Sequence, residues 1–336
     1  MKTSLKDIAE TLKLSKTTIS WVLSGKGDEK GISLATHEKV FQCAKQLNYQ
    51  PNLLARSLNT GISGTIGLII PDITDSFYSK VARSIEKEAE TQGYSLMICS
   101  SESEIERENR MIRLFKAKQV DGIIVAPTKV SKIEIQNLVK EGYPLVLFDR
   151  YFPEMQTNYI IIDNEGSSYE LVKKMIDNGS SKIAIITTNP HLRTMNMRRE
   201  GYARALIEAN LPVDPDLYGE VTFVDYEKNV FKTLDQIFSK VPDVDGFFFT
   251  THILALEAFR YFYEKGININ KGYELACIHG VSAFRVLAPN MNIARMPIEE
   301  IGKNAVRILL GDIKYRLENS TEKKDVETLV LPCSLP

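Results

Sequence analysis

The sequence predicts an α/β protein in which a small all-α head precedes a larger region of parallel β-sheet. Apolar residues fall at helical spacing in the first sixty residues. From Ser63 onward, short β-branched runs alternate with amphipathic helical stretches, as in 65–70, 78–92 and 95–99. Such alternation is typical of parallel sheets flanked by helices. The length of 336 residues also exceeds one ordinary domain.

The head is expected to begin with two short helices joined by a tight turn. Their apolar residues can share one core and are Ile8, Ala9, Leu12, Leu14, Ile19, Val22 and Leu23. Ser15 is expected to cap the second helix, because its hydroxyl can accept from a free amide of the first turn. A third helix, about 34–48, is expected to complete the core with Val40, Phe41, Ala44 and Leu47. A small helical bundle without a DNA role shows the same spacing, so the pattern alone leaves both interpretations open.

The second helix is the candidate DNA-reading element. In a helix-turn-helix this helix enters the major groove with its N-terminal residues facing base edges. The pattern predicts that Lys16, Thr17 and Ser20 point outward, with Trp21 nearby. Residues 1–60 hold nine basic and five acidic residues, a net charge of +4, whereas the whole chain carries −1. Positive charge is therefore concentrated where phosphates would lie.

Composition narrows the classes of protein to which the chain can belong. A chain with 43% hydrophobic and 25% charged residues is typical of a globular protein with a real core. No transmembrane run or apolar signal segment is found, which predicts a cytoplasmic location. The four cysteines are scattered without the spacing of a disulfide framework or a zinc site, so we expect them to be small buried apolar residues. They are Cys43, Cys99, Cys277 and Cys333. We expect no metal and no cofactor.

Catalytic motifs are missing, so we expect no enzyme. The stretch 280–284 lacks the closing glycine of a nucleophile elbow, and the glycines at 61, 64 and 67 do not form a dinucleotide-binding fingerprint.

Further strands are expected at 122–125, 145–148, 159–162, 182–187, 246–250, 274–278 and 292–295. About ten strands are too many for one small sheet, so we expect a split near Asp163 into two doubly wound subdomains. Ligands of such folds bind beyond the carboxyl ends of the strands, in the crevice between lobes.

Several segments occur in an order that resembles the lactose/galactose/purine repressor (LacI/GalR) family of transcriptional regulators. In the head these are LKDIA at 5–9, SKTTIS at 15–20, NYQPN at 48–52 and ARSL at 55–58. Weaker matches continue at 64–73, 120–124, 162–164 and 297–302, so the resemblance covers nearly all of the chain.

The resemblance implies a core of the periplasmic-binding-protein type behind the helix-turn-helix head. It places the head at 1–50, a hinge helix and linker at 51–62, and the effector-binding core at 63–336. The chain would cross back near Asn290, giving an N-subdomain of about 63–162 and 291–322 and a C-subdomain of about 163–290 and 323–336.

The hinge segment is expected to fold only when two subunits sit on the operator, with Leu58 wedged into the minor groove. A seven-residue helix is too short to be stable alone, which agrees with this expectation. An ordinary linker helix is the alternative. The candidate DNA-binding residues are Lys6, Ser15, Lys16, Thr17, Thr18, Ser20, Trp21, Asn52, Ala55, Arg56 and Leu58. The head departs from its relatives at Trp21 and in a longer loop at 25–31, so the operator sequence cannot be transferred from them.

The effector site is expected to combine strand-end residues of both lobes. The candidates are Asp72, Phe77, Tyr78, Asp149, Thr194, Arg198, Phe223, His252 and His279. Arg198 matches the family's effector-binding arginine, whose fork of donors suits hydroxyls or a carboxylate. His252 and His279 replace aspartates that relatives use, which would remove negative charge from the crevice and favour a sugar acid or sugar phosphate. A neutral sugar remains an alternative.

The expected function is that of a homodimeric transcriptional repressor that binds a near-palindromic double-stranded operator under the control of a small-molecule effector. The strand-like end at 326–336 favours a dimer over a tetramer. A periplasmic-type solute-binding protein without a DNA role is the alternative, and it accounts for neither the basic head nor the missing export signal. Effector identity, the direction of its effect, and activation as opposed to repression stay open.

Overall fold

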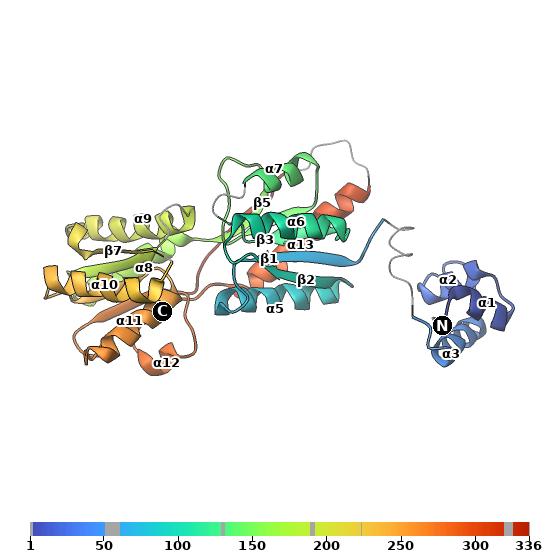
Figure 1. Ribbon diagram of the computed structural model, residues 1–336, viewed down its shortest axis with the longest axis horizontal. Helices are drawn as coiled ribbons and strands as arrows, with labels where there is room; N and C mark the ends of the chain where they lie inside the picture. The colour runs from blue at the N-terminus through green and yellow to red at the C-terminus, as the bar shows by residue number, and fades with distance from the viewer. Residues whose placement is uncertain are drawn as a thin grey trace. The chain divides into compact units, whose positions relative to one another are not determined.

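The computed structural model describes residues 3–50, 61–128, 132–188, 192–222, 224–318 and 325–335. The chain divides into two compact units, residues 1–63 and 64–336, called here the head and the core (Figure 1). Of the expected site residues, Asn52, Ala55, Arg56, Leu58 and Phe223 lie outside the described residues. None of the helices in the described ranges is long and apolar enough to cross a membrane.

The head contains three helices, α1 (Leu5–Leu12), α2 (Lys16–Leu23) and α3 (Leu34–Gln46). Their buried core centres on Ile8, Ile19, Val22 and Val40, as the spacing predicts. A capping box fixes the start of α1: the Ser4 hydroxyl accepts from the Asp7 amide, and the Ser4 amide donates to the Asp7 carboxylate at 2.7 Å.

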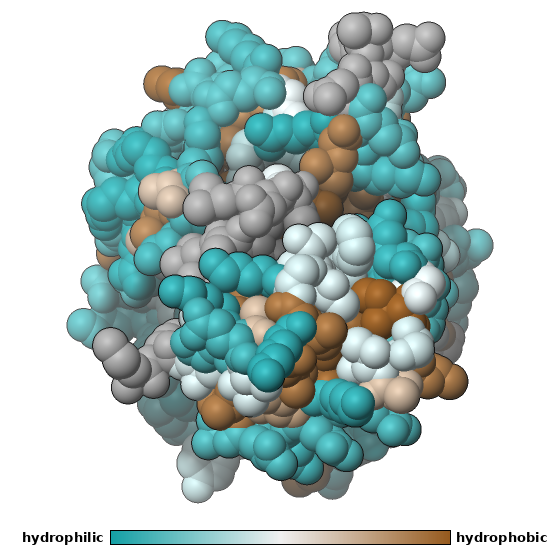
Figure 2. All heavy atoms as spheres, turned by 90° about the vertical axis from the view of Figure 1, so that its right-hand side faces the viewer, coloured by the Kyte–Doolittle hydropathy of each residue, from teal (hydrophilic) through white to brown (hydrophobic). Residues whose placement is uncertain are grey.

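The third helix differs from the expectation in two details. It ends at Gln46, because the Tyr49 amide donates back to the Ala44 carbonyl at 2.8 Å and Asn48 turns to a left-handed φ of 47°. Phe41 does not belong to the core and exposes 53% of its surface, since Val40 and Ala44 already fill the inward positions. Figure 2 shows apolar patches among a mostly hydrophilic surface.

The first lobe of the core is a parallel sheet with strand order β11-β5-β4-β3-β1-β2. Its strands are β1 (Thr65–Ile70), β2 (Ser95–Ser100), β3 (Gly122–Val125), β4 (Leu145–Phe148), β5 (Asn158–Ile162) and β11 (Thr328–Leu331). Helices α5 (Ser76–Thr91) and α13 (Ile298–Leu317) pack together on one face. Helices α6 (Ile105–Ala117) and α7 (Lys132–Lys140) bury Phe115, Ile135 and Leu138 against the other face.

The second lobe is a parallel sheet with strand order β10-β9-β8-β6-β7. Its strands are β6 (Ile183–Thr188), β7 (Tyr218–Val221), β8 (Gly246–Phe249), β9 (Glu274–Ile278) and β10 (Asn292–Ala294). One face carries α8 (Asn164–Asp177) and α9 (Arg193–Glu208). The other carries α10 (Tyr226–Lys240), α11 (His252–Glu264) and the short α12 (Phe284–Leu287), while the turn η1 (Pro215–Leu217) leads into β7.

The last part of the chain is divided between the lobes differently from the expectation. The resemblance implies that 291–322 belongs to the first lobe, but β10 extends the second sheet through the register Asn292↔Ala276, so the chain returns only after Ala294. It also implies that 323–336 belongs to the second lobe, but β11 pairs with β5 of the first sheet through Thr328↔Tyr159. A strand at the first sheet's open edge satisfies backbone groups that would otherwise stay unpaired.

Three segments of the described chain connect the two lobes and lie side by side. They follow β5, β10 and β11. The Asp163 amide donates to the Leu331 carbonyl at 2.9 Å, and Arg295 and Ser334 exchange backbone hydrogen bonds at 2.8 and 2.9 Å. The C-terminal segment is therefore part of the joint between the lobes.

Candidate functional site

The first candidate site is the outer face of α2. Ile19 and Val22 are buried in the head, and their helical spacing leaves Lys16, Thr17 and Ser20 exposed on the opposite side. The start of the helix is fixed by Ser15, whose hydroxyl accepts from the Thr18 amide at 3.0 Å.

Three of the other expected DNA-binding residues already make contacts within the head. The hydroxyls of Ser15 and Thr18 lie 2.8 Å apart and share a hydrogen bond. The Lys6 ammonium lies 3.5 Å from a Glu10 carboxylate oxygen on the surface of α1. Ser15 and Thr18 thus position the helix start, whereas Lys16, Thr17 and Ser20 present the polar surface.

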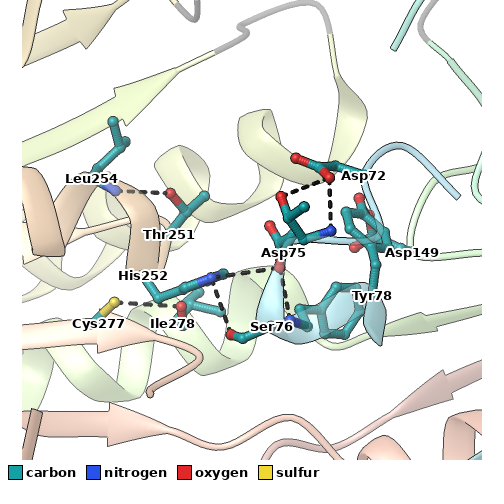
Figure 3. Close-up of polar contacts among 12 residues, drawn as sticks. Asp72, Asp75, Ser76, Tyr78, Asp149, Thr251, His252, Leu254, Cys277 and Ile278 are labelled. Carbon is teal, nitrogen blue, oxygen red and sulfur yellow. Dashed lines mark hydrogen bonds and ion pairs between the residues drawn. The ribbon is translucent and has the colours of Figure 1, made fainter. Parts of the chain in front are cut away.

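The second candidate site is the crevice between the lobes, where the loop after β1 meets the start of α11 (Figure 3). Asp75 caps α5 by accepting from the Phe77 amide at 2.7 Å. The same carboxylate oxygen lies 3.5 Å from His252 Nε2, which is also 3.4 Å from the Ser76 hydroxyl. Direct polar contacts therefore join the two lobes at this point. Neither Asp75 nor Ser76 was expected here, although both directly precede Phe77 in the loop after the first strand.

His279 directly follows β9 and lies next to His252. Its ring centre is 4.9 Å from that of His252 and 5.6 Å from that of Phe77. It adopts a left-handed φ of 64°, and its buried Nε2 has no hydrogen-bond partner among the described residues. A histidine in this backbone conformation is uncommon, and such strain often marks functional sites.

Burial makes both imidazoles poor cations. It lowers the pKa of His279 to about 3, helped by the proximity of His252. Burial also lowers the pKa of His252, against the opposing effect of Asp75, and it raises the pKa of the Asp75 carboxyl. At neutral pH neither imidazole therefore supplies a positive charge to an anionic ligand. A neutral imidazole instead offers one donor and one acceptor.

The end of β4 supplies a further polar group. The Tyr78 hydroxyl donates to the Asp149 carboxylate at 2.7 Å, and the Arg150 Nε lies 3.6 Å from the same oxygen. Burial raises the pKa of Tyr78 well above its ordinary value, so this hydroxyl remains a donor. Asp149 also has a positive φ, of 61°.

Arg198 lies inside the second lobe near the joint and is only 2% exposed. Its Nε donates to the Asn164 side-chain oxygen at 2.8 Å, and its Nη1 donates to the Thr250 carbonyl at 2.6 Å. The guanidinium thus connects the start of α8 with the end of β8. Burial lowers its pKa from the ordinary value. Asn164 and Thr250 are not among the expected site residues, although Asn164 belongs to the segment 162–164 that resembles the family.

A hollow of about 190 Å³ lies at the carboxyl ends of β3, β4 and β6, with walls from both lobes. Its lining includes Thr128, Lys132, Arg150, Tyr151, Arg193 and Thr194. The Thr128 hydroxyl is almost fully buried and has no hydrogen-bond partner among the described residues. Arg193 reaches Glu200 at 2.6 Å. Of this set, Thr194 is one of the expected site residues, whereas no motif points to Thr128 or Lys132.

The structure therefore brings Phe77, Tyr78, Asp149, His252 and His279 close to one another. Asp72 is turned into its own loop, where its carboxylate accepts from the Thr74 amide and hydroxyl at 2.8 Å each. Among the residues that the structure describes, no cluster of ligating side chains could hold a metal ion.

Both units match known families. Residues 4–52 match the model for bacterial regulatory proteins of the lacI family, and residues 63–328 match the model for periplasmic binding proteins and the sugar binding domain of the LacI family.

Relatives and solved structures of this kind align with nearly the whole chain. The ribose operon repressor of Halalkalibacterium halodurans is 30% identical over 329 residues, covering 97% of this chain and 92% of the relative. Catabolite control protein A of Priestia megaterium is 27% identical, covering 97% and 96%. The lac repressor dimer bound to operator and the anti-inducer ONPF has a TM-score of 0.83 at 20% identity, covering 100% of this chain and 98% of that chain. The CelR–cellobiose complex has a TM-score of 0.72 at 22% identity, with the same coverage.

At sequence identities of 20% and 22%, the likeness to the solved structures establishes the fold, whereas the matches to the two family models establish the family. The matched relatives include operon and transcriptional repressors. The chain therefore belongs to the LacI family of bacterial regulatory proteins, and it is a DNA-binding transcriptional regulator with a sugar-binding core.

Proposed function

We propose that this regulator reads its operator through Lys16, Thr17, Ser20 and Trp21, with Ser15 and Thr18 holding the reading helix in place. The observation that carries this proposal is the polar exposed face of α2, opposite the buried Ile19 and Val22. Lysine can donate to guanine acceptors, and the threonine methyl can contact a thymine methyl. The 51–62 segment with Leu58 is proposed as the minor-groove element between two heads.

The effector is proposed to bind in the crevice, between the loop after β1 and the strand ends of the second lobe. This site combines donors and acceptors of three kinds. They are the neutral imidazoles of His252 and His279, the carboxylates of Asp75 and Asp149, and the guanidiniums of Arg150 and Arg198. Such a mixture suits a ligand with several hydroxyl groups, each of which both donates and accepts. We therefore propose a sugar or a sugar acid as the ligand class.

Binding in the crevice is proposed to control the DNA affinity through lobe closure. Asp75 and Ser76 of the first lobe contact His252 of the second, so a ligand that enters between them replaces contacts that join the lobes. A ligand can shift the balance of open and closed arrangements only by its difference in affinity for the two arrangements. In a homodimer, such closure would alter the spacing of the two hinge segments.

Two measurements test this function. The full chain should select a near-palindromic duplex from a random library, and its affinity should fall linearly with salt on logarithmic axes. Calorimetry with neutral sugars, uronates and sugar phosphates should then identify a ligand that changes the affinity for the selected duplex. A protein that prefers no duplex over bulk competitor, with or without these ligands, contradicts the proposal.

The alternative of a solute-binding protein draws support from the crevice alone. It predicts ligand binding without any selected duplex. A regulator that acts on DNA is proposed to work in the cytoplasm, which fractionation of the native host's cells would check.

A further inference from the structure

The segment 25–31 after the reading helix is folded against the head. The Lys26 amide donates to the Trp21 carbonyl at 2.9 Å, and the Ile32 amide donates to the Gly27 carbonyl at 3.0 Å. The Asp28 carboxylate lies 3.8 Å from His37 Nε2 on α3. A Cβ on Gly27 would lie 2.1 Å from the same nitrogen, so the chain passes directly against the imidazole. These contacts give the segment a defined place on the head.

This place brings Lys30 over Trp21. The Lys30 ammonium lies 5.6 Å from the centre of the indole ring, within the range of a cation–π contact. Trp21 is 37% exposed and follows Thr17 by four residues, so both lie on one face of α2. The aromatic ring therefore extends the surface that Lys16, Thr17 and Ser20 begin.

Within residues 3–50, no carboxylate forms an ion pair with Lys30. The ion pairs of this range are Lys6–Glu10 and Asp28–His37. An ammonium has three donors, and a contact with a ring face leaves donors for another acceptor. A phosphate oxygen is the acceptor that a DNA-binding head meets at the edge of the groove.

We propose that Trp21 and Lys30 together form a second DNA-contacting element of the head, beyond the first turn of α2. The indole lies against a thymine methyl in the major groove, and Lys30 donates to a neighbouring backbone phosphate while holding the ring in place. The partner is thus a B-form duplex with a thymine at one position of each half-site. The inference rests on the DNA-binding function proposed above.

The chain carries a reporter for this contact, because Trp21 is its only tryptophan. We expect the tryptophan emission of the full chain to change when the protein is saturated with the duplex selected from the random library. The ligands of the calorimetric panel, added without DNA, should leave the emission unchanged.

Charge removal tests the phosphate contact. Lys30→Gln should reduce the magnitude of the logarithmic salt slope by about 0.9 for each bound head. Lys26→Gln is the matched control, because Lys26 is an exposed lysine of the same segment without a ring contact in residues 3–50. This control should change the slope by less than half as much.

A double-mutant cycle tests the pairing itself. Trp21→Ala and Lys30→Gln should be non-additive in their effects on affinity, whereas Trp21→Ala and Lys26→Gln should be additive. Trp21→Ala should also relax the preference for thymine at one position of the selected half-site. Far-UV circular dichroism of each variant should match the wild type, which excludes loss of folding as the cause.

The outcomes of these experiments distinguish a failure of the Trp21–Lys30 inference from a failure of the proposed DNA-binding function. If the wild type selects a duplex and Thr17→Ala abolishes selection, but the Trp21 emission and the Lys30→Gln slope stay unchanged, the inference is overturned and the DNA-binding function stands. If the wild type selects no duplex, both are overturned.

Discussion

His279 shows how burial, helped by the neighbouring His252, sets the protonation of a single residue. Its pKa falls from the ordinary value of 6.5 to about 3, since its environment disfavours the imidazolium. Between these two values the unfolded chain binds more protons at this residue than the folded chain does. Stability therefore falls as the pH decreases from 6.5 towards 3, and above 6.5 the residue contributes no pH dependence.

We predict that His279→Asn reduces this acid sensitivity. Asparagine does not titrate, and it tolerates the left-handed φ of 64° at this position. The urea midpoint should drop less between pH 7.5 and pH 5.0 in the variant than in the wild type. His37→Asn is the control, because His37 lies in the head. Equal midpoint changes in wild type and His279→Asn would contradict the assignment.

Arg198 should matter more for ligand binding than for stability. Arg198→Met removes the donors to Asn164 and the Thr250 carbonyl, but it also relieves the cost of burying a guanidinium. We expect the affinity for the best ligand of the calorimetric panel to fall by about 10- to 100-fold, equivalent to about 1.5–3 kcal/mol for a hydrogen bond to a charged group. The free energy of unfolding should change far less than the loss of these two hydrogen bonds alone would cause, because the cost of burying the guanidinium is relieved at the same time.

Isothermal titration calorimetry and urea unfolding measure these two quantities. Arg199→Met provides the control, because Arg199 is the next residue and contacts Tyr218, with a hydrogen bond of 3.3 Å to its hydroxyl and the guanidinium 5.9 Å from the centre of its ring. An unchanged affinity in Arg198→Met would remove this residue from the effector site.

At this scale the sequence identified the residue types better than their roles. Strand-end positions pointed to His252 and His279, and the structure places the two rings 4.9 Å apart, because parallel strands end at one edge of a sheet. Their charge state could not be predicted, since it depends on burial by Phe77 and on the opposing Asp75. Asp72 could not be distinguished from Asp75 either, because each carboxylate follows β1 and only the fold turns one into its own loop.

Among the elements, the reading helix depends on its first residue. Ser15→Ala removes the hydroxyl that accepts from the Thr18 amide, and loss of an N-cap costs about 1 kcal/mol. We expect the head to unfold at a lower temperature and the affinity for the selected duplex to fall.

The head offers a matched control for this change. Ser33 occupies the same position before α3, but its side chain makes no capping hydrogen bond to the helix backbone. Circular dichroism at 222 nm should therefore show a larger loss of thermal stability in Ser15→Ala than in Ser33→Ala. Equal losses would show that the Ser15 cap contributes nothing specific.

The sequence predicted the bounds of the strands from β1 to β10, apart from β7, within one or two residues, but it did not predict the helices from α6 to α13 individually. It missed β7, whose run from Tyr218 to Val221 contains Gly219 and Glu220 and lacks the β-branched pattern. It also placed the final strand in the wrong lobe. The residues of β11 are apolar enough for either sheet, so only the free edge beside β5 decides the pairing.

For the whole molecule, the contact between Asp75 and His252 is expected to favour the closed arrangement of the lobes. Asp75→Asn isolates this effect, because asparagine still caps α5 but carries no charge opposite the imidazole. Small-angle X-ray scattering of the ligand-free variant should give a larger radius of gyration than that of the wild type. Ser79→Ala, a change elsewhere on α5, should leave the radius unchanged. A variant as compact as the wild type would show that this pair does not hold the lobes together.

The joint between the lobes restricts the kind of movement that an effector can cause. A connection through one strand permits torsion about the long axis, whereas the three adjacent segments at Asp163, Arg295 and Ser334 resist torsion and leave bending as the soft motion. The crevice therefore has close to one degree of freedom. Deleting residues 332–336 would remove one of the three connectors, and the remaining pair would allow the lobes to rotate out of the alignment that places His252 opposite Asp75.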